Sequence, residues 1–124
     1  MARISVIEDN PDNRLLVRAM LGNRYDLEEY VNGPDALIGL RGNKPDLVLL
    51  DISLPQMDGP EVLQNIRADH NLRDLPVIAL TAHAMAGDRE RFLSQGFDEY
   101  LSKPIVDSSL LIAMIERLLH PDND

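Results

Sequence analysis

The sequence predicts an open α/β fold: a five-stranded parallel sheet, in the strand order 2-1-3-4-5, with five helices on both of its faces. Two observations support this prediction. Short aliphatic runs alternate with helical patterns along the chain, and glycine or proline stands at the boundaries between them. The 124 residues are also 44% hydrophobic, which is enough for one well-buried core. We therefore expect a single domain that spans residues 1–124.

Five segments are predicted to be strands. The aliphatic runs that suit central strands of a parallel sheet are residues 4–7, 47–50 and 77–80. Residues 26–31 contain Glu28 and Glu29 and therefore suit an edge strand, and residues 99–102 form a weaker fifth strand. Because crossovers between parallel strands are right-handed, a polar second strand at an edge fits the order 2-1-3-4-5.

Apolar residues at spacings of three and four predict the helices between these strands. The positions that define four of them are Leu15, Leu16, Ala19 and Met20; Ala36, Leu37 and Leu40; Val62, Leu63 and Ile66; and Leu110, Leu111, Met114, Ile115, Leu118 and Leu119. Gly22, Gly42 and Gly96 follow helical stretches, as C-terminal caps would. This topology places the ligand crevice at the carboxyl ends of the first and third strands.

Acidic residues stand at those two carboxyl ends, namely Glu8 and Asp9 after the first strand and Asp51 after the third. Two such charges roughly 5 Å apart repel by about 3 kcal/mol at an effective dielectric near 20. A raised carboxyl pKa, a lysine or a divalent cation could relieve the repulsion. Lys103 supplies one positive charge for three acids. Since the ligands are oxygens and the chain has no cysteine, a hard ion such as Mg²⁺ (or Mn²⁺) is favoured.

Thr81 and Lys103 stand at the ends of the fourth and fifth predicted strands and extend this constellation. A hydroxyl, an ammonium and a carboxylate-held cation around one projecting carboxylate are suited to stabilising a phosphoryl group in transfer. Asp51 would be the nucleophile and would form an acyl phosphate. Taken singly, Thr81 could be a helix cap and Lys103 a solvated loop residue, but the combination favours phosphoryl transfer.

Five motifs resemble those of the receiver domains of two-component response regulators. They are VIEDN at residues 6–10, PDLVLLD at 45–51, LPQMDG at 54–59, PVIALTA at 76–82 and YLSKP at 100–104. Together they span essentially the whole chain in the family's order, and the chain is most similar to single-domain, chemotaxis-regulator-like members. The resemblance implies a flavodoxin-like fold and a phosphorylation-switched signalling module that is not an enzyme beyond its own phosphorylation and dephosphorylation.

The resemblance also implies roles for individual residues. In a phosphorelay, Asp51 would take a phosphoryl group from a phosphohistidine, become a 4-aspartylphosphate and slowly lose the group again. The implied metal ligands are Glu8 (largely through water), Asp9, Asp51 and the backbone carbonyl of Ser53. Lys103 and Thr81 would contact the phosphoryl group, and Thr81 would form a switch pair with Tyr100. The peptide bond before Pro104 is expected to be cis.

Kinetics and partners are expected from the same resemblance. Ser53 and His83 occupy positions that border the path of the hydrolytic water, which makes them possible modulators of phosphoryl lifetime. A sensor histidine kinase or a histidine phosphotransfer protein would supply the phosphoryl group. An effector protein would bind the face formed by the fourth helix, fifth strand and fifth helix. The domain is expected to be a monomer or a phosphorylation-dependent dimer.

Charge and hydropathy exclude some classes of partner. The formal net charge of −9 and the pI near 4.6 argue against binding to nucleic acids or anionic membranes. There is neither a signal-peptide pattern nor an apolar stretch of transmembrane length, so a cytoplasmic location is expected. Met1 just before the first strand favours a stand-alone regulator over a receiver excised from a hybrid kinase or multidomain regulator.

Two other functional classes fit the architecture less well. A phosphatase of the haloacid dehalogenase type also uses an aspartate nucleophile after a strand, but it needs a second acid two residues later, where this chain has Ser53. A flavodoxin-like cofactor-binding module would need a phosphate-binding loop after the first strand. The acidic segment at residues 8–12 would repel phosphate unless a metal intervened.

Overall fold

The computed structural model describes residues 1–82 and 85–121. Five parallel strands form one sheet in the order β2-β1-β3-β4-β5, which confirms the predicted topology. The strands are β1 (Arg3–Ile7), β2 (Asp26–Tyr30), β3 (Leu47–Asp51), β4 (Val77–Thr81) and β5 (Glu99–Ser102). The polar strand β2 lies at one edge, as its two glutamates predicted, and β5 lies at the other.

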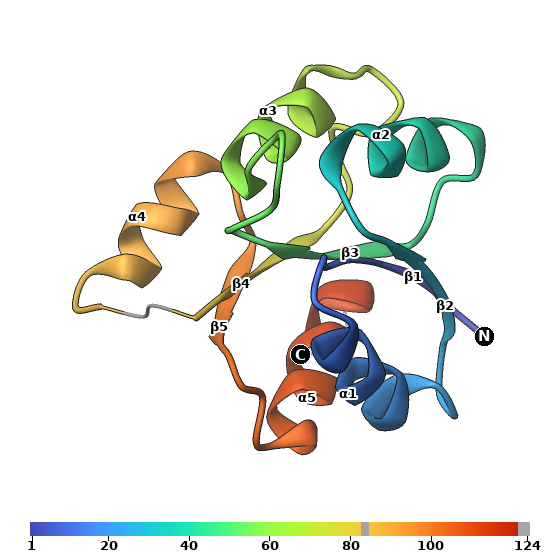
Figure 1. Ribbon diagram of the computed structural model, residues 1–124, viewed down its shortest axis with the longest axis vertical. Helices are drawn as coiled ribbons and strands as arrows, with labels where there is room; N and C mark the ends of the chain where they lie inside the picture. Colours follow the sequence, from blue (N-terminus) through green and yellow to red (C-terminus); the bar gives the residue numbers. More distant parts are fainter. Residues whose placement is uncertain (83–84, 122–124) are drawn as a thin grey trace.

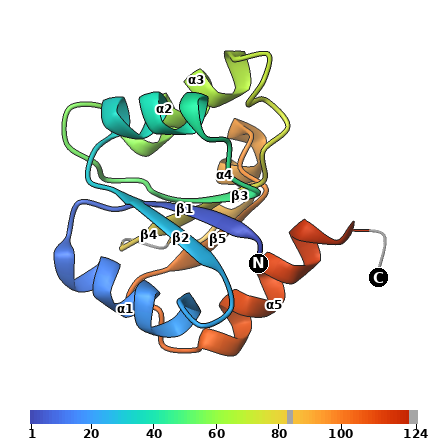
Figure 2. The same cartoon turned by 90° about the vertical axis from the view of Figure 1, so that its right-hand side faces the viewer.

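Helices cover both faces of this sheet (Figures 1 and 2). They are α1 (Pro11–Leu21), α2 (Gly33–Gly42), α3 (Gly59–Ala68), α4 (Asp88–Gln95) and α5 (Ser108–Leu119). In Figure 1, α1 and α5 lie on one side of the sheet, α2 and α3 lie on the other, and α4 lies beside β5. No helix within the described ranges is long and apolar enough to cross a membrane.

The central strands alternate their side chains between two apolar layers. Val48 and Leu50 pack in the layer beneath α2 and α3, whereas Leu47 and Leu49 pack in the layer against α1 and α5. All four are fully buried, and burying each such side chain contributes about 1.5–3 kcal/mol to folding. The short aliphatic runs seen in the sequence thus reflect strands that are buried on both faces.

Four helices begin with a side-chain cap. The N-cap residues, whose side chains accept backbone N–H groups of the first turn, are Asn10 (α1), Asn32 (α2), Asp58 (α3) and Asp107 (α5). Helix α4 differs, because its N-cap is Gly87, which has φ +85° and no side chain to accept a hydrogen bond.

The helix ends match two of the three predicted caps. Gly22 caps α1, and Gly96 caps α4 with φ +112°, a left-handed conformation that favours glycine. The prediction for Gly42 is wrong: it is the last residue of α2, and Asn43 is the cap. Here the helical hydrogen-bonding pattern continues through the glycine, because the backbone N–H of Asn43 still donates to Gly39.

Candidate functional site

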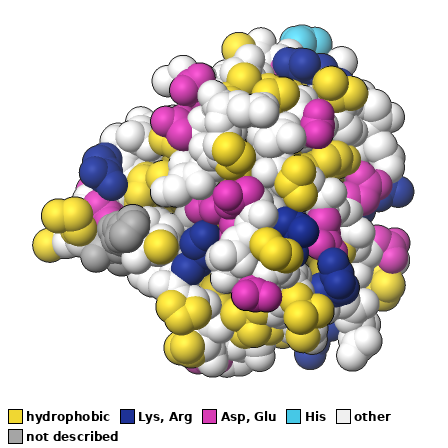
Figure 3. All heavy atoms as spheres, in the orientation of Figure 1, with side chains coloured by type: hydrophobic (Ala, Val, Ile, Leu, Met, Phe, Trp, Pro, Cys, Tyr) yellow, Lys and Arg dark blue, Asp and Glu magenta, His cyan; other side chains and the backbone are white. Residues whose placement is uncertain are grey.

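An open cleft of about 480 Å³ lies at the carboxyl ends of the strands, where the topology predicted a ligand crevice. The residues that line it are Glu8, Asp9, Asn10, Asn13, Asp51, Ser53, Ala82, Lys103 and Pro104. Figure 3 shows acidic side chains gathered near the middle of this face, over the carboxyl ends of β1 and β3, with basic side chains beside them. Loops that follow four different strands therefore contribute to one cleft.

Asp51 is the last residue of β3 and is 2% exposed. Its Oδ1 accepts a hydrogen bond from the backbone N–H of Ser53 at 3.1 Å, and its Oδ2 lies 3.1 Å from Nζ of Lys103. The chain then turns closely into α3, since a Cβ on Gly59 would lie 2.6 Å from the carbonyl oxygen of Asp51. Backbone and side-chain contacts thus hold the Asp51 carboxylate in one orientation at the rim of the cleft.

Glu8 is buried directly after β1 and shares Lys103 with Asp51. The ammonium lies 2.9 Å from Oε1 of Glu8, and Oε2 accepts the backbone N–H of Asn10 at 3.1 Å. Burial raises the pKa of Glu8, nearby Asp51 adds to this, and the hydrogen bond from Lys103 opposes it. Burial alone would lower the pKa of Lys103, but its hydrogen bonds to Glu8 and Asp51 prevail and raise that pKa. Lys103 therefore remains an ammonium at neutral pH.

Asp9 completes a group of three acids. Oxygens of Glu8, Asp9 and Asp51 all lie within 4.8 Å of one another, and Asp9 is exposed to solvent whereas the other two are buried. One ammonium cannot neutralise three carboxylates at this separation. An all-oxygen donor set with one solvent-exposed member suits a hard cation that keeps part of its water shell, as Mg²⁺ does. The residues present therefore fit the metal that the sequence suggested.

Thr81 lies next to these acids at the end of β4. Asp51 pairs with Leu80 in the register of β3 and β4, so Thr81 is one residue further toward the cleft, and its side chain is buried. Its carbonyl oxygen accepts the backbone N–H of Lys103 at 2.7 Å. The peptide bond between Lys103 and Pro104 is cis, the isomer that the resemblance implied.

Tyr100 lies away from the acidic cleft. It pairs with Ala79 on β4 and its half-buried ring lies 5.7 Å from the ring of Phe92 on α4. In the register of β4 and β5, Ala79 and Thr81 are two residues apart, so they point to the same face of the sheet as Tyr100. Thr81 and Tyr100 thus lie on neighbouring strands with the Tyr100 ring against α4.

Other candidates have different outcomes. Ser53 lines the cleft and its side chain is exposed. His83 lies outside the described residues. The sequence-based interpretation did not single out Asn10, which caps α1 and binds Glu8, or Arg14, whose guanidinium donates to the carbonyls of Glu8 and Asp9. An asparagine directly after the acid pair and before Pro11 was an available signal for the cap, but no sequence pattern indicated the arginine contact.

Comparison with known proteins places this arrangement in a family. The family model of the response regulator receiver domain matches residues 4–116. The polar-differentiation response regulator DivK of Brucella anthropi is 43% identical over 103 residues, which cover 82% of this chain and 84% of that protein.

Two solved structures are similar throughout. The receiver domain of the sensor histidine kinase PA1611 from Pseudomonas aeruginosa, with a magnesium ion coordinated in its active site cleft, has a TM-score of 0.86 and 36% identity, and the match covers 95% of this chain and 97% of that one. The signal receiver domain of a signal transduction histidine kinase from Syntrophus aciditrophicus has a TM-score of 0.87 and 30% identity, over 99% and 93% of the two chains.

Proposed function

Because this chain belongs to the response regulator receiver domain family, we propose that Asp51 accepts a phosphoryl group from a phosphohistidine and that the domain then signals to a partner. The observation that carries the proposal is the position of the Asp51 carboxylate, which is held by Ser53 and Lys103 at an open cleft beside two further acids. No second acid follows at position 53, which disfavours a phosphatase of the haloacid dehalogenase type.

The chemistry is a transfer between two nucleophiles. An oxygen of the Asp51 carboxylate attacks phosphorus, the P–N bond of the phosphohistidine breaks, and the imidazole leaves with the bonding electron pair and takes a proton. The product is an acyl phosphate, which water later hydrolyses. The ammonium of Lys103 stabilises charge on the phosphoryl oxygens, and the hydroxyl of Thr81 donates a hydrogen bond to one of them.

A divalent cation belongs to this proposal. Glu8, Asp9, Asp51 and the backbone carbonyl of Ser53 would hold Mg²⁺ or Mn²⁺, with Glu8 acting largely through water. The ion supplies positive charge that offsets the repulsion between the incoming phosphoryl group and the acids. Support comes from the close grouping of the three acids and from the magnesium ion in the similar receiver domain of Pseudomonas aeruginosa.

The signal would leave through α4, β5 and α5. A groove of about 520 Å³ lies on this face, lined in part by Tyr100, Leu101, Ile105, Val106, Leu110 and Met114. Its rim residue Val106 is 88% exposed, so the groove offers apolar surface to a protein partner. Phosphorylation at Asp51 biases Thr81 and the Tyr100 ring, and thereby changes this surface. A sensor kinase or phosphotransfer protein upstream, an effector protein downstream and a cytoplasmic single domain complete the proposal.

The experiment is phosphorylation by a small donor. Wild-type protein incubated with acetyl phosphate and Mg²⁺ is expected to gain one phosphoryl group by intact mass, whereas Asp51→Asn gains none because the nucleophilic oxygen is lost. Asp46→Asn is the matched control, since Asp46 lies directly before the first residue of β3, whereas Asp51 is the last residue of this strand. The Asp46 side chain accepts the backbone N–H of Arg3, and an asparagine oxygen can accept the same hydrogen bond. Equal labelling of Asp51→Asn and Asp46→Asn would show that the proposed acceptor is wrong.

A further inference from the structure

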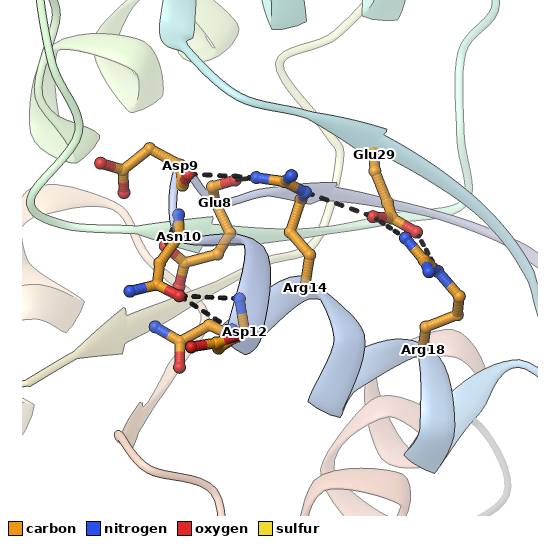
Figure 4. Close-up of polar contacts among 8 residues, drawn as sticks. Glu8, Asp9, Asn10, Asp12, Arg14, Arg18 and Glu29 are labelled. Atoms are coloured by element: carbon orange, nitrogen blue, oxygen red, sulfur yellow. Dashed lines mark hydrogen bonds and ion pairs between the residues drawn. The ribbon is translucent and has the colours of Figure 1, made fainter.

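Arg14, in the first turns of α1, connects the acidic turn to the sheet edge (Figure 4). Its Nη1 donates to the carbonyl oxygens of Glu8 at 3.0 Å and of Asp9 at 3.1 Å. On its other side, Nε lies 3.4 Å from a carboxylate oxygen of Glu29 on β2. We propose that Arg14 is a positioning residue: it fixes the backbone of the Glu8–Asp9 turn and thereby sets the affinity of the site for its divalent cation.

Glu29 holds the arginine in place. Its carboxylate forms a two-pronged pair with Arg18, in which Nε and Nη2 of Arg18 each donate at 2.8 Å, and the hydrogen bond from Arg18 lowers the pKa of Glu29. The side chains of Arg14 and Glu29 are only about one-fifth exposed. Figure 4 shows Arg14 between the acidic turn and Glu29, with Arg18 approaching Glu29 from one turn further along α1.

The backbone that Arg14 contacts carries two of the three acids. The N–H of Glu8 donates to Tyr30 of β2 at 3.0 Å, and Asn10 already begins the cap of α1, so the turn between them is very short. Because Arg14 binds both carbonyls of this turn, it restrains the direction in which the Glu8 and Asp9 side chains leave the backbone. Mg²⁺ and similar ions demand near-ideal geometry, so a loosened turn binds them less well.

The positive charge of Arg14 and its restraint of the turn have opposite effects on the affinity for the cation, so the two effects can be told apart by experiment. A positive charge near a cation site disfavours the cation, so removing the charge alone strengthens binding. Removing the restraint weakens it. Arg18 provides the control, because it carries the same charge and shares Glu29 but contacts neither carbonyl of the turn in the interactions described.

The inference rests on the proposed function, since it concerns the cation site of that function. The test titrates wild type, Arg14→Met and Arg18→Met with Mn²⁺ and measures the free ion by electron paramagnetic resonance. Arg14→Met is expected to weaken binding by about tenfold or more, as for other outer-shell partners of metal ligands, whereas Arg18→Met leaves it unchanged or slightly tighter. Arg14→Met binding that equals or exceeds that of Arg18→Met overturns the inference. Absence of Mn²⁺ binding by the wild type would instead count against the proposed function.

Two further measurements separate positioning from general loss of structure. Glu29→Gln keeps Arg14 and both carbonyl contacts but weakens the anchor, and it is expected to reduce Mn²⁺ affinity in the same direction by a smaller factor. At saturating Mn²⁺, labelling of Arg14→Met by acetyl phosphate is expected to return to the wild-type rate, because Arg14 contacts no reacting atom. Unchanged affinity in Glu29→Gln, or slow labelling of Arg14→Met at saturation, contradicts the positioning role.

Discussion

Ser5 is an unusual residue of the central sheet. Among the described residues, the Oγ of Ser5 is the one buried side-chain oxygen or nitrogen atom that has no hydrogen-bond partner. Ser5 itself is fully buried on β1, which lies between β2 and β3. A buried hydroxyl that loses its contacts with water and gains none in the protein costs free energy. Ser5 therefore weakens the sheet next to the strand end that carries the acids.

Replacing Ser5 by alanine is expected to stabilise the protein. Removal of an unsatisfied hydroxyl should raise the free energy of unfolding by roughly 0.5–1.5 kcal/mol, measured by urea denaturation. Ser94→Ala is the control, because the Ser94 hydroxyl donates to the carbonyl of Arg91 at 2.7 Å. The loss of this hydrogen bond offsets the roughly 0.5 kcal/mol that the higher helix propensity of alanine adds in α4, so no net gain is expected. A lower unfolding free energy for Ser5→Ala than for wild type would mean that Oγ has a partner in solution.

The residues of the candidate site differ in how far the sequence predicts their positions. Glu8, Asp51 and Lys103 could be predicted to meet because parallel strands bring their carboxyl ends to one edge, whichever rotamers the side chains adopt. The contact of Arg14 with Glu29 could not, because it depends on the register of the edge strand and on the direction of two long side chains. Topology fixes the first kind of contact, and side-chain packing fixes the second.

At the scale of elements, Glu99 joins one strand to two helices. Its carboxylate, 8% exposed, lies 3.2 Å from Nε of Arg89 on α4 and 3.0 Å from Nη2 of Arg117 on α5. The neighbouring residue on β5 is Tyr100, and Arg89 and Arg117 also line the groove described above. The ion pairs therefore hold α4 and α5 against the strand that carries the Tyr100 ring.

Glu99→Gln should loosen this connection. An exposed ion pair contributes about 0–1 kcal/mol, while breaking a buried one costs about 3–5 kcal/mol. Since Glu99 is buried and both arginines are about half-exposed, we expect an intermediate loss of roughly 1–2 kcal/mol in unfolding free energy, measured by urea denaturation. Glu90→Gln, at an exposed position of α4, is expected to change it by less than about 0.5 kcal/mol. Equal effects of the two variants would exclude a structural role for the Glu99 pairs.

The elements themselves were largely predictable from the sequence. Unbroken apolar runs located the three central strands, because these strands are buried on both faces of the sheet. The edge strands β2 and β5 are less buried and gave weaker signals in the sequence. Periodicity defined α4 least well, since this eight-residue helix buries only Asp88 and Phe92 and so has no apolar stripe. The end of α2 was misplaced at Gly42 because local glycine chemistry competes with continued helical hydrogen bonding.

At the scale of the whole molecule, one hydrogen bond joins distant parts of the chain. The hydroxyl of Tyr25, which precedes β2, donates to Oε2 of Glu116 on α5 at 2.5 Å, 91 residues away. Burial, followed by the hydrogen bond and the charge of Glu116, raises the pKa of Tyr25 to about 12. The phenol therefore stays protonated in the folded protein at pH values where an unfolded tyrosine ionises.

This shift predicts the sign of a pH dependence. Below the unfolded pKa, about 10, the phenol is neutral in both states and its contribution to stability is fully present. Above the unfolded pKa, the unfolded state releases the phenol proton and is stabilised relative to the folded state. The contribution to stability is therefore lost as the pH rises through the folded pKa of about 12. The difference in unfolding free energy between wild type and Tyr25→Phe, measured by urea denaturation, should be constant below pH 10 and shrink above it. Phenolate absorbance showing that Tyr25 ionises near its unfolded pKa would contradict this.

The two left-handed glycines that flank α4 have a mechanical consequence. Gly87 and Gly96 bound a helix that buries a single apolar side chain, Phe92, whereas every other helix buries at least two. Few buried contacts mean a low free energy of local displacement. We therefore expect α4, which packs against the Tyr100 ring through Phe92, to be displaced at a lower free energy than the other helices. A change at Asp51, the last residue of β3, is then expected to displace α4 before it displaces the sheet or the other helices.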